Sequence, residues 1–201
     1  DIMTIKVLAY LIIPAYTIAF TGGYNWFTTN FSVIGNLMDK KLAFLIWGIV
    51  VGLYFYLIYR RLRPLVRLRP LFSRLIPAAL ALLFCAITTP YLPDEMPLKS
   101  FLHIVFAFVS TVLLLIYLAA VVWVRYRLNP GPYRPYLAGL ASILMISLVL
   151  LAMAGIISSA LEIFVTLTTV AMSERLSSRI RREGPWKKAA ALWSLTGSRA
   201  A

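Results

Sequence analysis

Long apolar runs separated by short polar links make up most of this chain. Each run is close to the ~20 residues that an α-helix needs to cross ~30 Å of hydrocarbon. Four of them are clearly bounded, at about residues 2–20, 42–59, 75–90 and 101–124. The pattern predicts an all-α, polytopic integral membrane protein in which residues 1–172 form a single membrane domain.

The last apolar run, Leu137–Met172, is too long for one span. Its 36 residues would measure ~54 Å as a single helix at the usual helical rise. Two spans, at about 137–154 and 156–172, would fit, with a tight turn between Ala154-Gly155 and Ser159. One long tilted helix is the alternative and would give five spans instead of six.

The distribution of positive charge decides between five and six spans. Six arginines lie between the second and third runs, in Arg60–Arg74. Short links rich in Lys and Arg stay on the cytoplasmic side of the membrane. With six spans and a cytoplasmic N-terminus, 17 of the 20 Lys and Arg residues lie inside, and only Lys40, Lys41 and Lys99 lie outside. We therefore expect a six-transmembrane-helix bundle with cytoplasmic N- and C-termini.

Composition agrees with this prediction and limits the choice of partners. The chain has 201 residues, of which 61% are hydrophobic and only 13% charged, and a formal net charge of +13. Because the basic residues flank the spans in short links, we expect them to contact membrane lipids, with anionic inner-leaflet headgroups at the links, and no nucleic acid.

Two further patterns each allow two interpretations. Gly48 and Gly52 have the spacing that lets helices approach closely, either within the bundle or in a homo- or hetero-oligomer. Residues 173–201 form a basic cytoplasmic tail with arginines at helical spacing, followed by Trp186 and Trp193. The tail is either a solvated linker or an amphipathic helix on the inner leaflet.

The inventory of ligating residues excludes several kinds of site. Cys85 and His103 are the only residues of their types. An internal disulfide, a cysteine metal cluster and a three-histidine zinc site are therefore ruled out within one chain. Glycine-rich phosphate loops are also missing from the sequence. We predict no metal and no cofactor, and we expect no cleavable signal peptide.

Polar residues that could carry chemistry gather on the predicted outer side. Glu162 is the one acidic residue within an apolar run, where ionisable groups are costly and often functional. Ser159, Thr166, Thr169 and Ser173 share its helix face. His103 begins the fourth span, and the two long outer loops contribute Asn30, Ser32, Asn36 and Asp94. These residues predict an outward-facing polar pocket that binds a ligand.

The same loops carry a family resemblance. Asn30-x-Ser-x-x-Gly35, Pro93-Asp94 and Leu102-His103 with Ala107 resemble the FRAG/DRAM/Sfk-type six-span superfamily, and in particular its bacterial members. The resemblance implies a serine-centred motif in the first outer loop, a histidine at the start of the fourth span and a location in the bacterial cytoplasmic membrane. Its eukaryotic relatives act in lipid-anchor remodelling, phosphoinositide organisation and autophagy. Val33 departs from the pattern, because the family usually has an acid there.

Four functions are compatible with these features. The leading hypothesis is a non-enzymatic membrane protein whose outer pocket binds, or helps translocate, a lipid or small amphiphile. The second is an ion or solute transporter or channel that uses Glu162. The third is a lipid hydrolase or transacylase with Ser32 as nucleophile, His103 as base and Asp94 as its orienting group. The fourth is an assembly or regulatory partner of another membrane protein, docked through Gly48 and Gly52.

Overall fold

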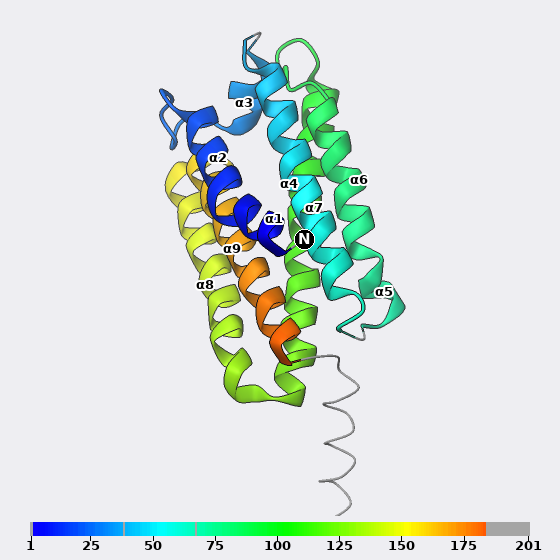
Figure 1. Ribbon diagram of the computed structural model, residues 1–201. Helices are drawn as coiled ribbons and strands as arrows, with labels where there is room; N and C mark the ends of the chain where they lie inside the picture. The colour runs from blue at the N-terminus through cyan, green and yellow to red at the C-terminus, as the bar shows by residue number, and fades with distance from the viewer. Residues whose placement is uncertain (1, 38, 67, 184–201) are drawn as a thin grey trace, which may run out of the picture.

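The computed structural model describes residues 2–37, 39–66 and 68–183, which form a helical bundle (Figure 1). Five of its helical segments are long and apolar enough to cross a membrane: Met3–Thr21, Lys41–Leu62, Pro70–Thr88, Pro97–Leu128 and Pro130–Ala154. Across the described ranges all regular structure is helical. The chain is therefore an all-α integral membrane protein.

The first long segment consists of α1 (Ile2–Val7), a π-helical turn η1 (Leu8–Ile12) and α2 (Ile13–Thr21). Within η1, the amide of Ile13 donates to the carbonyl of Leu8, one residue further back than in an α-helix. Pro14 follows at once and has no amide hydrogen to continue the regular ladder. The π-turn therefore lies directly before Pro14, where the α-helical ladder loses a donor.

A short helix, α3 (Phe31–Asn36), connects the first segment to α4 (Lys41–Leu62). After the arginine-rich link come α5 (Pro70–Ser73) and α6 (Leu75–Thr88), which lead into the long α7 (Pro97–Leu128). Figure 1 shows α3 and the α6–α7 loop at one end of the bundle and α5 and the α7–α8 turn at the other. We call these the α3 end and the α5 end.

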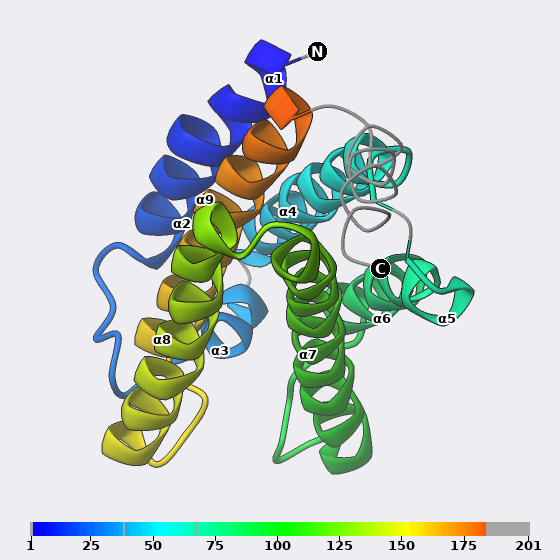
Figure 2. The same ribbon diagram turned by 90° about the horizontal axis from the view of Figure 1, so that it is seen from below.

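The long apolar run near the C-terminus is divided into two helices, as predicted. α8 (Pro130–Ala154) ends at Gly155, whose φ of 69° is the left-handed conformation that glycine adopts most easily. α9 (Ser159–Glu183) then runs back along the bundle. Figure 2 shows α2, α8 and α9 on one side and α6 and α7 on the other, with α4 between them.

Close packing of α4 on α6 explains the two glycines that share a helix face. A Cβ added to Gly48 would lie 2.6 Å from Cγ2 of Ile87 on α6, so only a residue without a side chain fits there. A Cβ added to Gly52 would lie 3.5 Å from Cδ2 of Leu83 on the same helix, an ordinary contact distance. The prediction of helix packing through this face is confirmed. Because α6 of the same chain covers it, the spacing needs no second protein to explain it.

Two sequence-based expectations differ from the structure. Tyr54, Tyr56 and Tyr59 lie just before the arginine-rich link, a pattern typical of tyrosines at a membrane interface. Tyr54 is instead fully buried, and its hydroxyl donates to the carbonyl of Val170 at 2.7 Å. The packed domain also continues past Met172. α9 extends to Glu183, and its residues Ser173, Glu174, Leu176, Ser177, Ser178 and Ile180 are buried. Trp186 and Trp193 lie outside the described residues.

Candidate functional site

The short helix α3 is fixed in place at both ends. The side chain of Asn30 caps its N-terminus by accepting from the amide of Val33 at 2.7 Å. At its C-terminus, Nδ2 of Asn36 donates to the carbonyl of Tyr91 in the α6–α7 loop at 2.6 Å. Two residues predicted to bind a ligand, Asn30 and Asn36, thus hold the helix that carries Ser32.

Aromatic packing holds the same helix against the bundle. Phe31 lies edge-on to Phe20 of α2 and to Trp47 of α4, with ring centroids 5.6 and 4.9 Å apart. Gly35 allows α3 to approach α4 closely, since a Cβ there would lie 2.4 Å from Cγ of Phe44. The glycine of the Asn30-x-Ser-x-x-Gly35 sequence is therefore required by the docking of α3.

Ser32 and His103 are in direct contact, although 71 residues separate them in the sequence. Oγ of Ser32 lies 2.6 Å from Nε2 of His103, and Nδ1 of His103 lies 2.9 Å from the backbone carbonyl oxygen of Thr89. The imidazole is 2% exposed, whereas Ser32 is partly accessible. A molecule that approaches this end of the bundle therefore meets the hydroxyl before the ring.

The partners of the ring determine the tautomer of a neutral His103. A backbone carbonyl can only accept a hydrogen bond, so Nδ1 must carry the proton. Nε2 is then an acceptor, and the hydroxyl of Ser32 donates to it. This arrangement matches a nucleophile with its general base, where the base is oriented by a third group. That third group is the main-chain carbonyl of Thr89.

Glu162 braces this site from α9. It lies in the first turn of that helix, and its Oε2 accepts from the amide of Phe31 at 2.7 Å. The neighbouring amides of Ser159 and Ala160 donate to the carbonyls of Thr29 and Trp26, at 2.7 and 2.8 Å. The N-terminus of α9 is therefore tied to the segment just before Ser32, and Glu162 is one of these ties.

Asp94 is not part of this arrangement. It is exposed in the α6–α7 loop and forms no hydrogen bond or ion pair within the described ranges. The carbonyl of Thr89 takes the position that was expected for its carboxylate. Sequence patterns could not single out Thr89, because every residue has a carbonyl and only the fold determines which one faces the ring.

Apolar side chains beside the dyad remain exposed. Val33, next to Ser32 on α3, is 43% exposed; Leu37, directly after α3, is 40% exposed; and Leu102, next to His103, is 37% exposed. A polar dyad beside exposed apolar residues suits an amphiphilic molecule better than a fully hydrophilic one.

Comparison with known proteins gives no further assignment. No family model, curated protein or solved structure matches the chain, and the resemblance to the FRAG/DRAM/Sfk-type superfamily therefore stays a prediction.

Proposed function

We propose that this protein is a lipid hydrolase or transacylase in which Ser32 and His103 act on an ester at the outer face of the membrane. The single observation that carries the proposal is the 2.6 Å contact between Oγ of Ser32 and Nε2 of His103, with Nδ1 anchored on Thr89. The proposed location is the bacterial cytoplasmic membrane.

The proposal includes a six-span arrangement with both termini in the cytoplasm. α9 has 25 residues and is long enough for a sixth crossing, but Glu162, Glu174 and Arg175 interrupt its apolar sequence. Its return from the α3 end to the α5 end supports the crossing (Figure 1). So does the position of the Arg60–Arg74 link at the α5 end, because basic links stay inside. The dyad then faces outward.

The reaction follows from the hydrogen bonds. Oγ of Ser32 would attack the ester carbonyl carbon while its proton passes to Nε2 of His103. The tetrahedral intermediate then expels the alcohol, which takes that proton, and leaves an acyl group on Ser32. Water or a second lipid hydroxyl would release the acyl group by the same steps. A lipid ester is the proposed substrate because Val33 and Leu102, the chain neighbours of Ser32 and His103, are exposed apolar residues.

The test measures both turnover and covalent labelling. Purified protein in detergent is incubated with a fluorescent phospholipid ester, and free or transferred acyl chains are quantified. Ser32→Ala and His103→Ala should each lower the rate by roughly 10²–10⁴-fold. Ser142→Ala, which changes an exposed serine on α8, is the matched control and should leave the rate unchanged.

A fluorophosphonate probe should label Ser32 and lose this labelling in the His103 variant. Turnover that persists in both dyad variants would refute the proposal.

A non-enzymatic lipid-binding or translocating protein is the second candidate. His103 is nearly completely buried, and its contact with Ser32 joins α3 to α7. The pair can therefore stabilise the fold without taking part in a reaction, which favours this second candidate. In that case no ester would be cleaved, the probe would not react, and bound lipid would be retained by the Ser32→Ala protein.

A further inference from the structure

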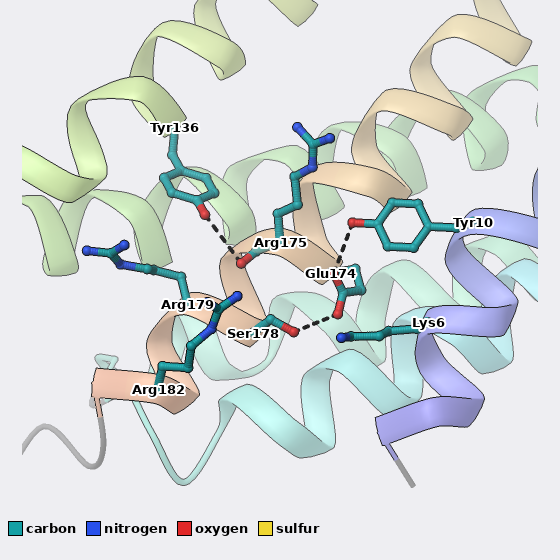
Figure 3. Close-up of a pocket in the computed structure, with 8 residues that line it drawn as sticks. All are labelled: Lys6, Tyr10, Tyr136, Glu174, Arg175, Ser178, Arg179 and Arg182. Carbon is teal, nitrogen blue, oxygen red and sulfur yellow. Dashed lines mark hydrogen bonds between the residues drawn. The ribbon is translucent and has the colours of Figure 1, made fainter.

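A second polar region lies near the α5 end of the bundle, away from the dyad. Side chains of α1, η1, α8 and α9 surround a cavity of about 360 Å³ (Figure 3). This volume falls within the ~300–1,000 Å³ typical of small-molecule sites. Four of the lining residues are cations: Lys6, Arg175, Arg179 and Arg182. We call this cavity the basic pocket.

The four cations come from two elements, and three of them are unneutralised. Arg175, Arg179 and Arg182 follow one another at intervals of four and three residues along α9, and Lys6 extends toward them from α1 (Figure 3). Arg179 pairs with Glu183, Nε to Oε1, at 2.8 Å. The other three cations form no ion pair with any residue that the structure describes.

The one carboxylate in the lining, Glu174, is already engaged. It is 3% exposed; its Oε2 accepts from the hydroxyl of Tyr10 at 3.0 Å, and its Oε1 accepts from Oγ of Ser178 at 2.6 Å. Tyr136 closes the opposite wall and donates to the carbonyl of Arg175 at 3.3 Å. Both carboxylate oxygens are therefore turned to neighbouring hydroxyls. Among the described residues, Lys6, Arg175 and Arg182 are left without an ion-pair partner.

We propose that the basic pocket binds one phosphate group, carried either by an anionic lipid headgroup or by a soluble phosphate ester. Guanidinium groups recognise phosphate through paired hydrogen bonds, and the pocket is lined by two unpaired guanidinium groups, of Arg175 and Arg182, beside the ammonium group of Lys6. In the proposed six-span arrangement Arg175 and Arg182 lie ~24 and ~34 Å beyond Ser159 along α9. These two heights lie on either side of the inner edge of the hydrocarbon core, which measures ~30 Å, so the pocket lies next to the inner-leaflet headgroups.

Native mass spectrometry of the full chain in detergent tests this assignment. The probes are phosphatidylglycerol, phosphatidylcholine and free glycerol phosphate. The pocket variant combines Lys6→Gln, Arg175→Gln and Arg182→Gln. The control variant combines Arg69→Gln, Arg74→Gln and Arg127→Gln, which removes the same charge from exposed residues outside the pocket. We expect one retained phosphatidylglycerol per wild-type chain, binding weakened on the order of 100-fold in the pocket variant and a loss below about 3-fold in the control.

The other results separate the sources of the phosphate. Free glycerol phosphate that binds as tightly as the lipid would identify a soluble ester as the ligand. Equal losses in both variants would mean diffuse attraction to a basic surface and would overturn the pocket.

Glu174→Gln provides a second test that needs no arginine to be removed. Loss of the only negative charge in the lining should tighten phosphate binding several-fold, since a nearby carboxylate repels an anion. Weaker phosphatidylglycerol binding in a folded Glu174→Gln protein would overturn the proposal. Neither experiment involves Ser32 or His103, so its failure is distinguishable from failure of the proposed hydrolase.

Discussion

The proton on His103 can be assigned from its two contacts. The carbonyl of Thr89 accepts the proton of Nδ1, and Nε2 is left to accept from Ser32. Neutral histidine in water usually carries its proton on Nε2, so the fold selects the less common tautomer. This selection leaves the basic nitrogen directed at the hydroxyl that is proposed to react.

The tautomer can be observed directly because the chain has a single histidine. In protein labelled with ¹⁵N-histidine, we expect one pair of ring signals at neutral pH, with Nδ1 protonated and Nε2 not. Ser32→Ala removes the donor to Nε2 and should shift the Nε2 signal more than the Nδ1 signal. A ring protonated at Nε2 would contradict the assignment of His103 as the base.

Glu162 is a second residue whose role is defined by a backbone contact. Its carboxylate accepts from the amide of Phe31, directly before Ser32. A glutamine at this position can still accept that hydrogen bond, whereas alanine leaves the amide without its partner. Leaving a buried donor unsatisfied costs about 1–3 kcal/mol.

We therefore expect Glu162→Ala to lower the free energy of unfolding by about 1–3 kcal/mol and Glu162→Gln to have a much smaller effect. Thermal unfolding of both proteins in the same detergent measures the difference. The transporter hypothesis predicts a large effect of Glu162→Gln on a different quantity: loss of the charge would abolish ion flux in proteoliposomes. Flux that requires the charge would support that mechanism over a bracing role.

At the level of elements, the contact of α4 with α6 depends on one glycine more than on its neighbour. A methyl group at Gly48 would overlap Ile87, while one at Gly52 would make an ordinary contact with Leu83. The two positions lie one helical turn apart on the same face. They therefore form a matched pair in which the same substitution meets different surroundings.

Gly48→Ala should lower the free energy of unfolding by about 1–3 kcal/mol through overpacking. Adding Ile87→Ala makes room for the new methyl group and should recover part of the lost stability. Gly52→Ala should be within about 0.5 kcal/mol of wild type. Unfolding of the reconstituted proteins by detergent titration gives both values. If both single variants keep wild-type stability but lose an oligomer seen by cross-linking, the glycine face would serve a partner instead.

For the whole molecule, sequence patterns located the apolar segments, the turn at Gly155 and the placement of Ser32 and His103 at the same end of the bundle. They could do so because an apolar run and a helix-ending glycine are each recognised from neighbouring residues alone. The contact of Ser32 with His103 depends on how α3 docks between distant helices. Beyond Met172, Glu174 of α9 accepts a hydrogen bond from Tyr10, a partner 164 residues away. Such pairings arise from tertiary packing, which a single sequence does not display.

Whether α9 crosses the membrane determines which side of the membrane the dyad and the basic pocket each face, and so connects the two proposed sites. With Cys85 replaced by serine, single cysteines can be placed at three exposed positions: Asn25 at the α3 end, and Arg127 and Arg182 at the α5 end. In intact cells, a membrane-impermeant maleimide should label Asn25→Cys and leave the other two unlabelled until the membrane is permeabilised. Labelling of Arg182→Cys from the medium, with Arg127→Cys protected, would mean that α9 does not cross the membrane. The basic pocket would then face the same side as the Ser32–His103 dyad, and an inner-leaflet headgroup could not reach it.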